Sequence, residues 1–246
     1  MSAVWVNDLS AGYGGADIVS GISFEVEPGE ILTMIGPNGG GKSTVLKAMC
    51  GLIKKSGGSV ELCGKNADFL SRTERSRILS VMLTERIRPD LMTCREVIAA
   101  GRYPYTGTFG ALTEEDEKIV ESAVRTVNAE DFADQDFNSV SDGQRQRVLL
   151  GTAICQQPKV LILDEPTSYL DIRHKIAFFE ILRGLADNGL AVVISLHELD
   201  FAEKVSDKVI CIQNGTLRRS DEPIFSPENV CGLYDIPREL YDKYFG

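Results

Sequence analysis

Two kinds of apolar pattern recur along the chain. Apolar and polar residues alternate over residues 4–9, 22–26 and 59–62, which predicts short strands with turns between them. Continuous apolar runs cover residues 31–35 and 160–163. Such runs are typical of parallel strands that are buried on both faces of a sheet. The chain therefore combines half-exposed strands with fully buried ones.

The second half of the chain alternates strands with helices. Further apolar runs at residues 190–195 and 208–212 are separated by helical patterns. This order is typical of right-handed βαβ crossovers in a parallel sheet. Asn214 and Gly215 predict a hairpin turn, and the segment from Pro227 onward predicts one or two short helices.

The middle third of the chain, from about residue 89 to residue 155, has a helical character instead. Three helix starts there carry a capping box or a close variant of it, at Thr93-x-x-Glu96, at Thr113 and at Ser141-x-x-Gln144. We interpret this stretch as a helical insertion in an α/β fold.

Composition narrows the class of protein. The chain has 246 residues, of which 43% are hydrophobic, enough for a full α/β core. Its formal net charge of -10 argues against a general nucleic-acid binder, so we expect no nucleic-acid partner. Six scattered cysteines without C-x-x-C spacing predict free thiols and fit a reducing cytoplasm. Residues 1–9 lack a signal-peptide pattern and the apolar run at 190–196 is too short to span a bilayer, so any membrane role would be peripheral.

A glycine-rich loop follows the first buried strand. It satisfies the pattern G-x-x-x-x-G-K-[ST] through Gly36, Gly41, Lys42 and Ser43, and a predicted helix follows it. Backbone N–H groups of such a loop cradle phosphate oxygens, the lysine neutralises their charge, and the hydroxyl ligates Mg²⁺. The alternative is a glycine-rich turn with an incidental lysine. The candidate nucleotide contacts are Gly36, Pro37, Asn38, Gly39, Gly40, Gly41, Lys42, Ser43 and Thr44.

Two adjacent acids, Asp164 and Glu165, end the second buried strand. We expect the Asp164 carboxylate to hold Mg²⁺ together with Ser43. Glu165 is the candidate to polarise an attacking water, and the alternative is that it only caps the loop before Pro166. The sequence thus predicts a protein that binds Mg²⁺ and ATP and hydrolyses the ATP.

The order and spacing of these motifs, with Ser141-Asp142-Gly143-Gln144 before the acidic strand and Asp171 and His197 after it, resemble the ATP-binding-cassette (ABC) ATPases over essentially the whole chain. The resemblance implies that Ser141, Gly143 and Gln144 form the signature motif, which contacts the γ-phosphate of ATP held by the opposite subunit. A capped helix N-terminus suits an anion, although an ordinary capping box would have the same residues. Asp142 replaces a glycine of the usual motif, and its effect stays open.

Three further roles come from the resemblance. It implies that His197 contacts the γ-phosphate and holds the water and Glu165, and that Asp171 lies in the loop crossing the dimer interface. It also implies that Tyr13 stacks on adenine, which any flat ring can do. The alternatives are a structural histidine and an ordinary turn tyrosine. His174 is interpreted as a surface residue.

The resemblance also implies an architecture. We expect one ABC ATPase domain, residues 1–246, with a P-loop NTPase (RecA-like) α/β core, an N-terminal antiparallel β-subdomain and an inserted helical subdomain. The expected bounds are 1–88 and 156–220 for the core, 89–155 for the helical subdomain with the signature motif, and 221–246 for a C-terminal helical tail.

One departure from the family falls after the predicted strand at 79–83. The family normally has a glutamine there that reaches Mg²⁺, whereas this chain has Thr84 followed by Glu85. Either side chain offers a hard oxygen ligand. We prefer Thr84 as the metal ligand because the register places it at the glutamine position.

The segment from Gly101 to Gly107 resembles that of cassette ATPases serving importers of iron chelates, haem and cobalamin; the alternative is a plain Gly/Pro turn. The resemblance implies an importer subunit that works as a homodimer or as one of a pair of cassettes. Its partners would be a polytopic membrane permease and, indirectly, a substrate-binding protein, at the inner face of the cell membrane. A soluble cassette ATPase, such as one serving iron–sulfur assembly, or a regulatory module that binds ATP without hydrolysing it are the alternatives.

Overall fold

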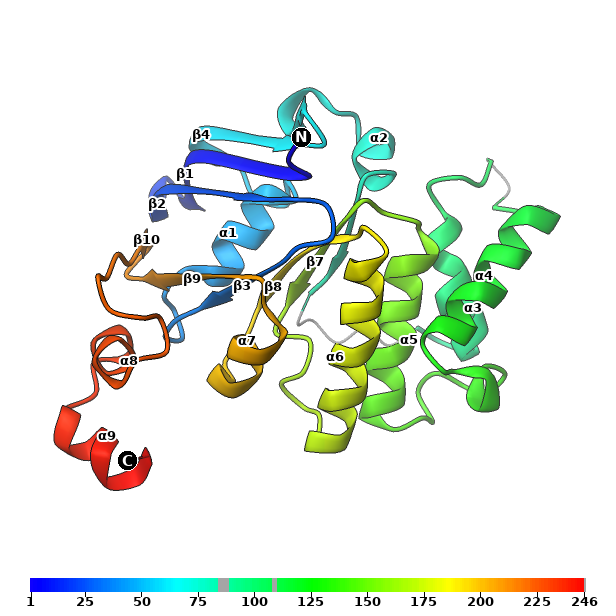
Figure 1. Cartoon of the computed structure of the whole chain (residues 1–246). Coiled ribbons are helices and arrows are strands. Elements are labelled where there is room, and N and C mark those ends of the chain that lie inside the picture. The colour runs from blue at the N-terminus through cyan, green and yellow to red at the C-terminus, as the bar shows by residue number, and fades with distance from the viewer. Residues whose placement is uncertain (84–88, 108–109, 246) are drawn as a thin grey trace.

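The computed structural model describes residues 1–83, 89–107 and 110–245 and contains two β-sheets (Figure 1). The larger sheet has six strands in the order β10-β9-β3-β8-β7-β6. Strands β9, β3, β8, β7 and β6 are parallel, and β10 pairs antiparallel with β9. The bounds in chain order are β3 Ile31–Ile35, β6 Leu79–Met82, β7 Val160–Asp164, β8 Ala191–Ser195, β9 Lys208–Gln213 and β10 Thr216–Leu217.

The parallel register brings several strand ends to one edge. Ser195 of β8 pairs with Met34 of β3 on one side and with Asp164 of β7 on the other. The segments that follow β3, β7 and β8 therefore leave the sheet next to each other. In an open α/β sheet this carboxyl edge is where ligands bind.

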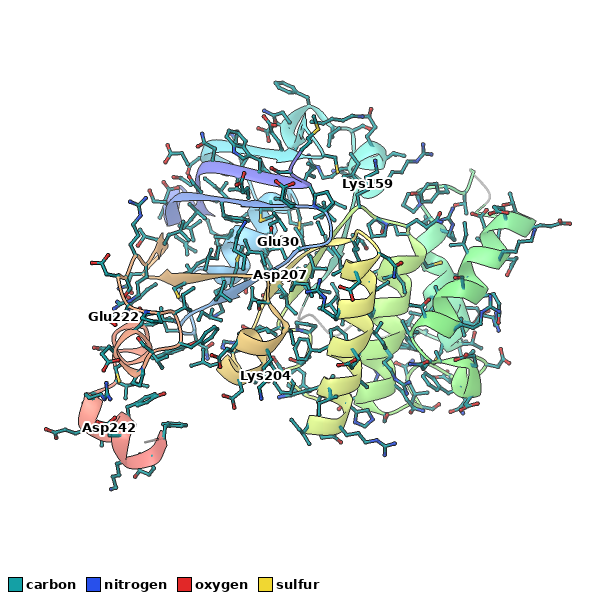
Figure 2. The ribbon with its side chains drawn as sticks, in the orientation of Figure 1. Glu30, Lys159, Lys204, Asp207, Glu222 and Asp242 are labelled. Atoms are coloured by element: carbon teal, nitrogen blue, oxygen red, sulfur yellow. The ribbon has the colours of Figure 1, made fainter. Side chains whose placement is uncertain are left out.

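At the opposite edge of the sheet, where the parallel strands begin, carboxylates form hydrogen bonds and ion pairs. Asp207 accepts a hydrogen bond from the Ile31 N–H at 2.8 Å and forms an ion pair with Arg183 at 2.8 Å. Lys208 pairs with Glu30 at 3.3 Å, and Figure 2 shows Glu30 and Asp207 at this edge. These charges are neutralised within the chain, so they stabilise the fold at the edge away from the predicted nucleotide loop.

The smaller sheet is antiparallel, in the order β2-β1-β4-β5. Its strands are β1 Val4–Tyr13, β2 Ala16–Val26, β4 Lys55–Leu62 and β5 Lys65–Asn66. Both β1 and β2 are longer than the alternation predicts. Register shifts after Val6 and after Leu9 interrupt the period of two, which hides the rest of β1 from a pattern search.

The six-stranded sheet is apolar on both faces, and each face belongs to a different core. Leu32 and Met34 of β3 lie in the core shared with helix α1 (Lys42–Met49) and the antiparallel sheet. Ile31 and Ile35 lie in the core shared with the helices on the other face. Figure 1 shows α1 between the two sheets. The predicted burial of β3 on both faces is confirmed.

The remaining helices are α2 Arg72–Ser76, α3 Cys94–Ala99, α4 Glu114–Thr126, α5 Asp142–Cys155, α6 Ile172–Asp187, α7 Leu199–Val205, α8 Pro227–Tyr234 and α9 Arg238–Phe245. Capping boxes start α3, α4 and α5, as the sequence predicts. Buried residues of α3, α4 and α5 share one core with α6 and α7. The predicted hairpin turn is the one between β9 and β10, with both Asn214 and Gly215 at positive φ.

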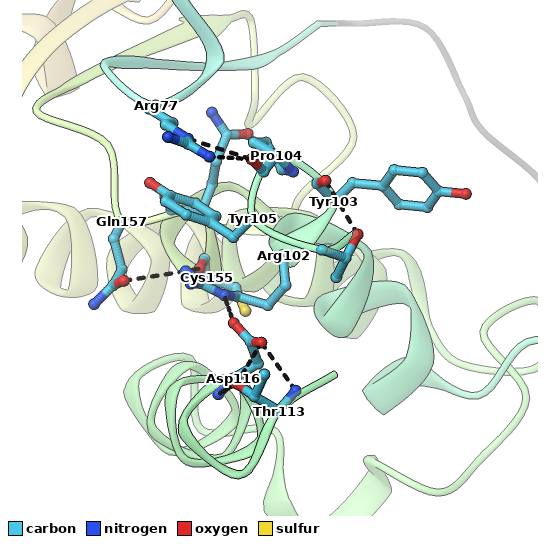
Figure 3. Close-up of polar contacts among 11 residues, drawn as sticks. Arg77, Arg102, Tyr103, Pro104, Tyr105, Thr113, Asp116, Cys155 and Gln157 are labelled. Atoms are coloured by element: carbon cyan, nitrogen blue, oxygen red, sulfur yellow. Dashed lines mark hydrogen bonds and ion pairs between the residues drawn. The ribbon is translucent and has the colours of Figure 1, made fainter. Parts of the chain in front are cut away.

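A buried ion pair fastens α4 to the segment after α3 (Figure 3). Arg102 Nε donates to Asp116 Oδ1 at 2.8 Å, and its Nη1 donates to the Cys155 carbonyl at 2.9 Å. The Tyr105 ring covers the guanidinium, whose carbon lies 4.0 Å from the ring centroid. Hydrogen bonds from the Thr113 hydroxyl and backbone N–H, with Arg102, lower the pKa of Asp116 to about 2. This network links α4, the segment after α3 and the end of α5 within the helical region.

Candidate functional site

The loop between β3 and α1 has a backbone that only glycine fits at two positions. Gly36 has φ 144° and Gly41 has φ 109°. A Cβ atom on Gly36 would lie 2.0 Å from the Ile212 carbonyl oxygen, and one on Gly41 would lie 2.5 Å from Val19 Cγ1. The loop is therefore pressed against β9 and β2 along its length. This close packing fixes the loop in space.

The turn after β9 supports the loop from the side. The Gly215 N–H donates to the Gly40 carbonyl at 3.0 Å, and the Ser20 N–H donates to the Gly215 carbonyl at 2.8 Å. The hairpin of β1 and β2 is thereby joined to the loop, with Tyr13 at the end of β1. Tyr13 is half exposed, so its ring is accessible to a ligand. The stacking of Tyr13 on adenine stays a prediction. Sequence reasoning missed the role of Gly215, whose partners are far away in the sequence.

Lys42 is the buried cation of the loop. Its Nζ donates to the carbonyls of Gly36 at 2.8 Å and Pro37 at 3.2 Å. Burial lowers the pKa of Lys42, and the negative charges of Glu165 and Asp164 oppose this shift. The positive charge of Lys42 is therefore attracted by two carboxylates at the end of another strand, β7. The structure brings the predicted glycine loop and the predicted acids together.

Asp164 and Ser43 are in direct contact. Ser43 Oγ donates to Asp164 Oδ1 at 3.0 Å, and Ser195 Oγ donates to the same oxygen at 2.7 Å. The Glu165 N–H in turn donates to Ser195 Oγ at 3.0 Å. The fully buried Ser195 hydroxyl thus orients both acids. The signal for Ser195 in the sequence is a lone hydroxyl at the end of an apolar strand, and its significance depends on the pairing of β8 with β7.

Glu165 and His197 form a second pair at the same edge of the sheet. His197 Nε2 lies 2.5 Å from Glu165 Oε1. Glu165 has φ 50°, which is uncommon for a residue with a side chain and marks strain that the surrounding structure must hold. Ser168 Oγ donates to the Glu165 carbonyl at 3.2 Å. A carboxylate and an imidazole in this contact can orient a water molecule.

Ser43 and Asp164 fit a magnesium ion. Mg²⁺ in proteins prefers oxygen ligands, and it is usually held by one or two carboxylates together with substrate phosphates and water. A hydroxyl and a carboxylate oxygen 3.0 Å apart at the rim of a phosphate-binding loop supply such a pair. Within the described ranges, no group of three or more His, Cys, Asp and Glu side chains is arranged to hold a metal alone. Thr84 and Glu85, the other candidate ligands, lie outside the described residues.

The residues around Ser141 form the start of α5. Ser141 Oγ accepts a hydrogen bond from the Gln144 N–H at 3.3 Å, and Gln144 Oε1 accepts one from the Ser141 N–H at 3.0 Å. The capping box is therefore present. Asp142 forms an ion pair with Arg145 at 2.6 Å, which offsets the negative charge that this substitution introduces. In Figure 1 the start of α5 lies away from the glycine loop, so one chain does not bring these two sets of residues together.

Asp171 lies beside the start of α5. It is the N-cap of α6, and its Oδ1 accepts a hydrogen bond from the His174 N–H at 2.9 Å. The same oxygen lies 2.8 Å from His174 Nδ1. The His174 ring packs against Gly143. The His174 side chain is 37% exposed, which agrees with the interpretation of His174 as a surface residue. Its contact with Gly143 was not predicted, because a single sequence does not show that α5 and α6 start side by side.

A glycine loop between a strand and a helix, close to an acidic pair at the end of another strand of the same sheet, defines the site of a P-loop nucleoside triphosphatase. Residues 19–168 match the family model described as ABC transporter. The chain belongs to this family: it is an ABC ATPase that binds ATP, and the predicted fold class is confirmed.

Relatives of the chain include three ATP-binding proteins. An uncharacterized ABC transporter ATP-binding protein of Methanocaldococcus jannaschii is 44% identical over 97% of this chain and 83% of the relative. The cobalamin import ATP-binding protein of Halobacterium salinarum is 35% identical over 94% of this chain, which spans 58% of that relative's length. The iron(3+)-hydroxamate import ATP-binding protein of Bacillus subtilis is 30% identical over 98% of this chain and 90% of the relative.

Solved structures share the fold. The ATP-binding subunit of an ABC transporter superposes with a TM-score of 0.78 at 25% identity, over 98% of this chain and 99% of that one. A bacterial ABC transporter cassette, determined in its dimeric form, gives a TM-score of 0.76 at 24% identity, over 88% of this chain and 97% of that one. Among the described residues, no helix has both the length and the apolar character needed to cross a membrane.

Proposed function

We propose that this chain is the ATP-hydrolysing subunit of a membrane importer for substrates of the iron-siderophore, haem or cobalamin type. The observation that carries the proposal is the pair of contacts at the carboxyl edge of the sheet, Ser43 with Asp164 and Glu165 with His197. Relatives that import cobalamin and iron(3+)-hydroxamate support the substrate class.

The proposed chemistry assigns a separate task to each pair. Backbone N–H groups of the glycine loop and the Lys42 ammonium bind the phosphates. Ser43 and Asp164 would hold Mg²⁺, which neutralises charge that develops on the phosphate oxygens. Glu165 orients the attacking water and accepts its proton, while His197 fixes the carboxylate and contacts the γ-phosphate. Tyr13 stacks on the adenine.

The signature residues complete the site in a second copy of the chain. Ser141, Gly143 and Gln144 lie at the start of α5, where Ser141 is exposed, Gln144 is partly exposed and Gly143 is buried. Free N–H groups and the helix dipole favour an anion at such a helix start. We therefore propose a homodimer or paired cassettes in which these residues face the ATP bound by the other subunit. Asp171 lies next to them and would cross the interface. ATP binding then drives closure and hydrolysis releases it.

A groove on the surface supports the proposal that the chain has a membrane partner. It has a volume of about 840 Å³ and lies between the end of α1, the segment from α2 to β6, and α5. Leu52, Val81 and Leu149 supply apolar lining, and Gln156 supplies a polar group. We propose that a cytoplasmic segment of a polytopic permease docks here, at the inner face of the membrane. The helical segment 89–155 would then move against the core, residues 1–88 and 156–220, and the tail 221–246 would follow the core.

The test is to express the chain together with candidate permease and solute-binding proteins from the neighbouring genes, and to reconstitute the purified complex in lipid vesicles. The proposal expects ATP-dependent uptake of the substrate and ATPase activity that the loaded binding protein stimulates. Glu165→Gln serves as the inactive control. Hydrolysis by a chain that binds no polytopic membrane protein would instead favour a soluble cassette ATPase.

A further inference from the structure

We propose that His174 is a positioning residue that couples Asp171, in the loop before α6, to the signature residues at the start of α5. The inference rests on the proposed closure of two chains around ATP. It concerns a contact within one chain: the imidazole of His174 is bonded to Asp171 on one side and packed against Gly143 on the other.

The first half of the contact is polar. Asp171 Oδ1 accepts the His174 N–H at 2.9 Å and lies 2.8 Å from the ring atom Nδ1. The same carboxylate oxygen therefore fixes both the backbone of the first turn of α6 and the orientation of the ring. These two hydrogen bonds lower the pKa of Asp171, so the residue stays an acceptor. A displacement of Asp171 must displace the imidazole.

The second half of the contact is steric. A Cβ atom on Gly143 would lie 2.4 Å from Cδ2, 2.6 Å from Cγ and 2.9 Å from Nε2 of His174. All three distances are under 3.0 Å, which real Cβ atoms essentially never show, so a methyl group here would force the ring to shift. Gly143 does not have a positive φ, so its backbone conformation does not require glycine. The ring of His174 is therefore what excludes a side chain at position 143.

The two halves form one mechanical connection. Gly143 lies in the first turn of α5, between the Ser141 and Gln144 of its capping box. The contact of the His174 ring with Gly143 therefore helps to fix the orientation of this helix start. In a closed pair of chains Asp171 would meet the other subunit while Ser141 and Gly143 meet its ATP. A rigid imidazole between them makes the two contacts form together rather than separately.

The experiment is a double-mutant cycle with Gly143→Ala and His174→Ala in the full chain. We measure ATP affinity of the isolated chain, ATP-dependent dimer formation in a Glu165→Gln background, and turnover without that substitution. Gly143→Ala should reduce turnover and dimer formation about tenfold or more, because its methyl group meets the ring. His174→Ala should reduce both several-fold while the ATP affinity of the isolated chain changes less than about twofold. In the double variant, turnover and dimer formation should recover to the level of His174→Ala.

Two single substitutions separate the halves of the connection. His174→Asn can still donate to Asp171 and lacks the ring edge, whereas His174→Phe keeps a ring and cannot donate. Both should fall short of the wild type in dimer formation, with thermal unfolding close to that of Glu180→Ala, the control at an exposed position on the same helix.

Three outcomes would overturn the inference. They are a double variant as impaired as Gly143→Ala, wild-type dimer formation by His174→Ala, and full function of either His174→Asn or His174→Phe. If the wild-type chain itself neither dimerises with ATP nor hydrolyses it, the proposed function fails instead, and the cycle reports no coupling to interpret.

Discussion

The two halves of the candidate nucleotide site are built in different ways. The glycine loop and the acids are joined by hydrogen bonds between α1, β7 and β8, through Ser43, Asp164 and Ser195. The signature residues are held locally, by a capping box and by the contact with His174. One half is assembled within the chain and partly buried, whereas the other, in which Ser141 is exposed and Gly143 is buried, lies apart from it. Because the two halves are built separately, we expect that mutations can separate ATP binding from ATP hydrolysis.

The largest expected effect is on turnover in the buried half. Glu165→Gln removes the proton acceptor and keeps the shape of the side chain, so turnover should fall about 10²- to 10⁴-fold while ATP binding is retained. Phosphate release measured under saturating ATP, with a nucleotide-binding titration, checks both parts. Glu180→Gln, on the exposed side of α6, is the matched control. Near-normal hydrolysis by Glu165→Gln would remove this residue from the proposed role.

The second prediction compares the halves directly. Lys42→Ala removes a buried cation of the loop, so the isolated chain should lose ATP affinity by about 10- to 100-fold. Ser141→Ala alters only the exposed helix start, so the isolated chain should bind ATP normally and lose turnover. A titration of each isolated variant with a fluorescent ATP analogue measures the difference. Equal losses of affinity in the two variants would contradict the division of the site between two chains.

A third prediction concerns Tyr13, which stands at the edge of the buried half. Tyr13→Ala removes the stacking surface, so the KM for ATP should rise about tenfold with little change in kcat. The KM for GTP should rise by a similar factor, because stacking does not distinguish bases. Tyr13→Phe keeps the ring and should behave as the wild type. A wild-type KM in Tyr13→Ala would show that the ring does not face the nucleotide.

The smallest expected effect on turnover comes from the ion pair in the helical region. Asp116→Asn leaves Arg102 buried without its charged partner, so the free energy of unfolding should fall by about 2 kcal/mol or more. The pKa of Asp116 is lowered from 3.8 to about 2, so its stabilising effect is present above pH 4 and is lost as the pH falls towards 2. Denaturant unfolding of both proteins should therefore differ at neutral pH and converge in acid. An unchanged gap at pH 2 would contradict this.

The sequence predicts the parts of the site that lie in one short segment. Gly36, Lys42, Asp164 and Glu165 were found from spacing, because each motif combines a strand end with its own loop. Ser195 was missed because its importance comes from the pairing of β8 with β7. This pairing allows Ser195 to donate a hydrogen bond to Asp164, which is 31 positions away in the sequence. The ends of the antiparallel strands were missed because register shifts break their alternation.

The helical region shows the same limit. Its three capping boxes were predicted, since each is contained in four residues. The packing of His174 on Gly143 was not, because it joins two helices whose relative position depends on the whole core. The ion pair of Asp142 with Arg145, one turn later, was not predicted either, and the effect of Asp142 on the signature motif stays open.

The hydroxyl of Ser195 donates to Asp164 and accepts from the backbone of Glu165 at the same time. A hydroxyl has a single hydrogen, so the two acids share one orienting group and neither can be adjusted independently. A substitution that moves Asp164, the proposed metal ligand, should therefore also shift Glu165, the residue proposed to orient the water.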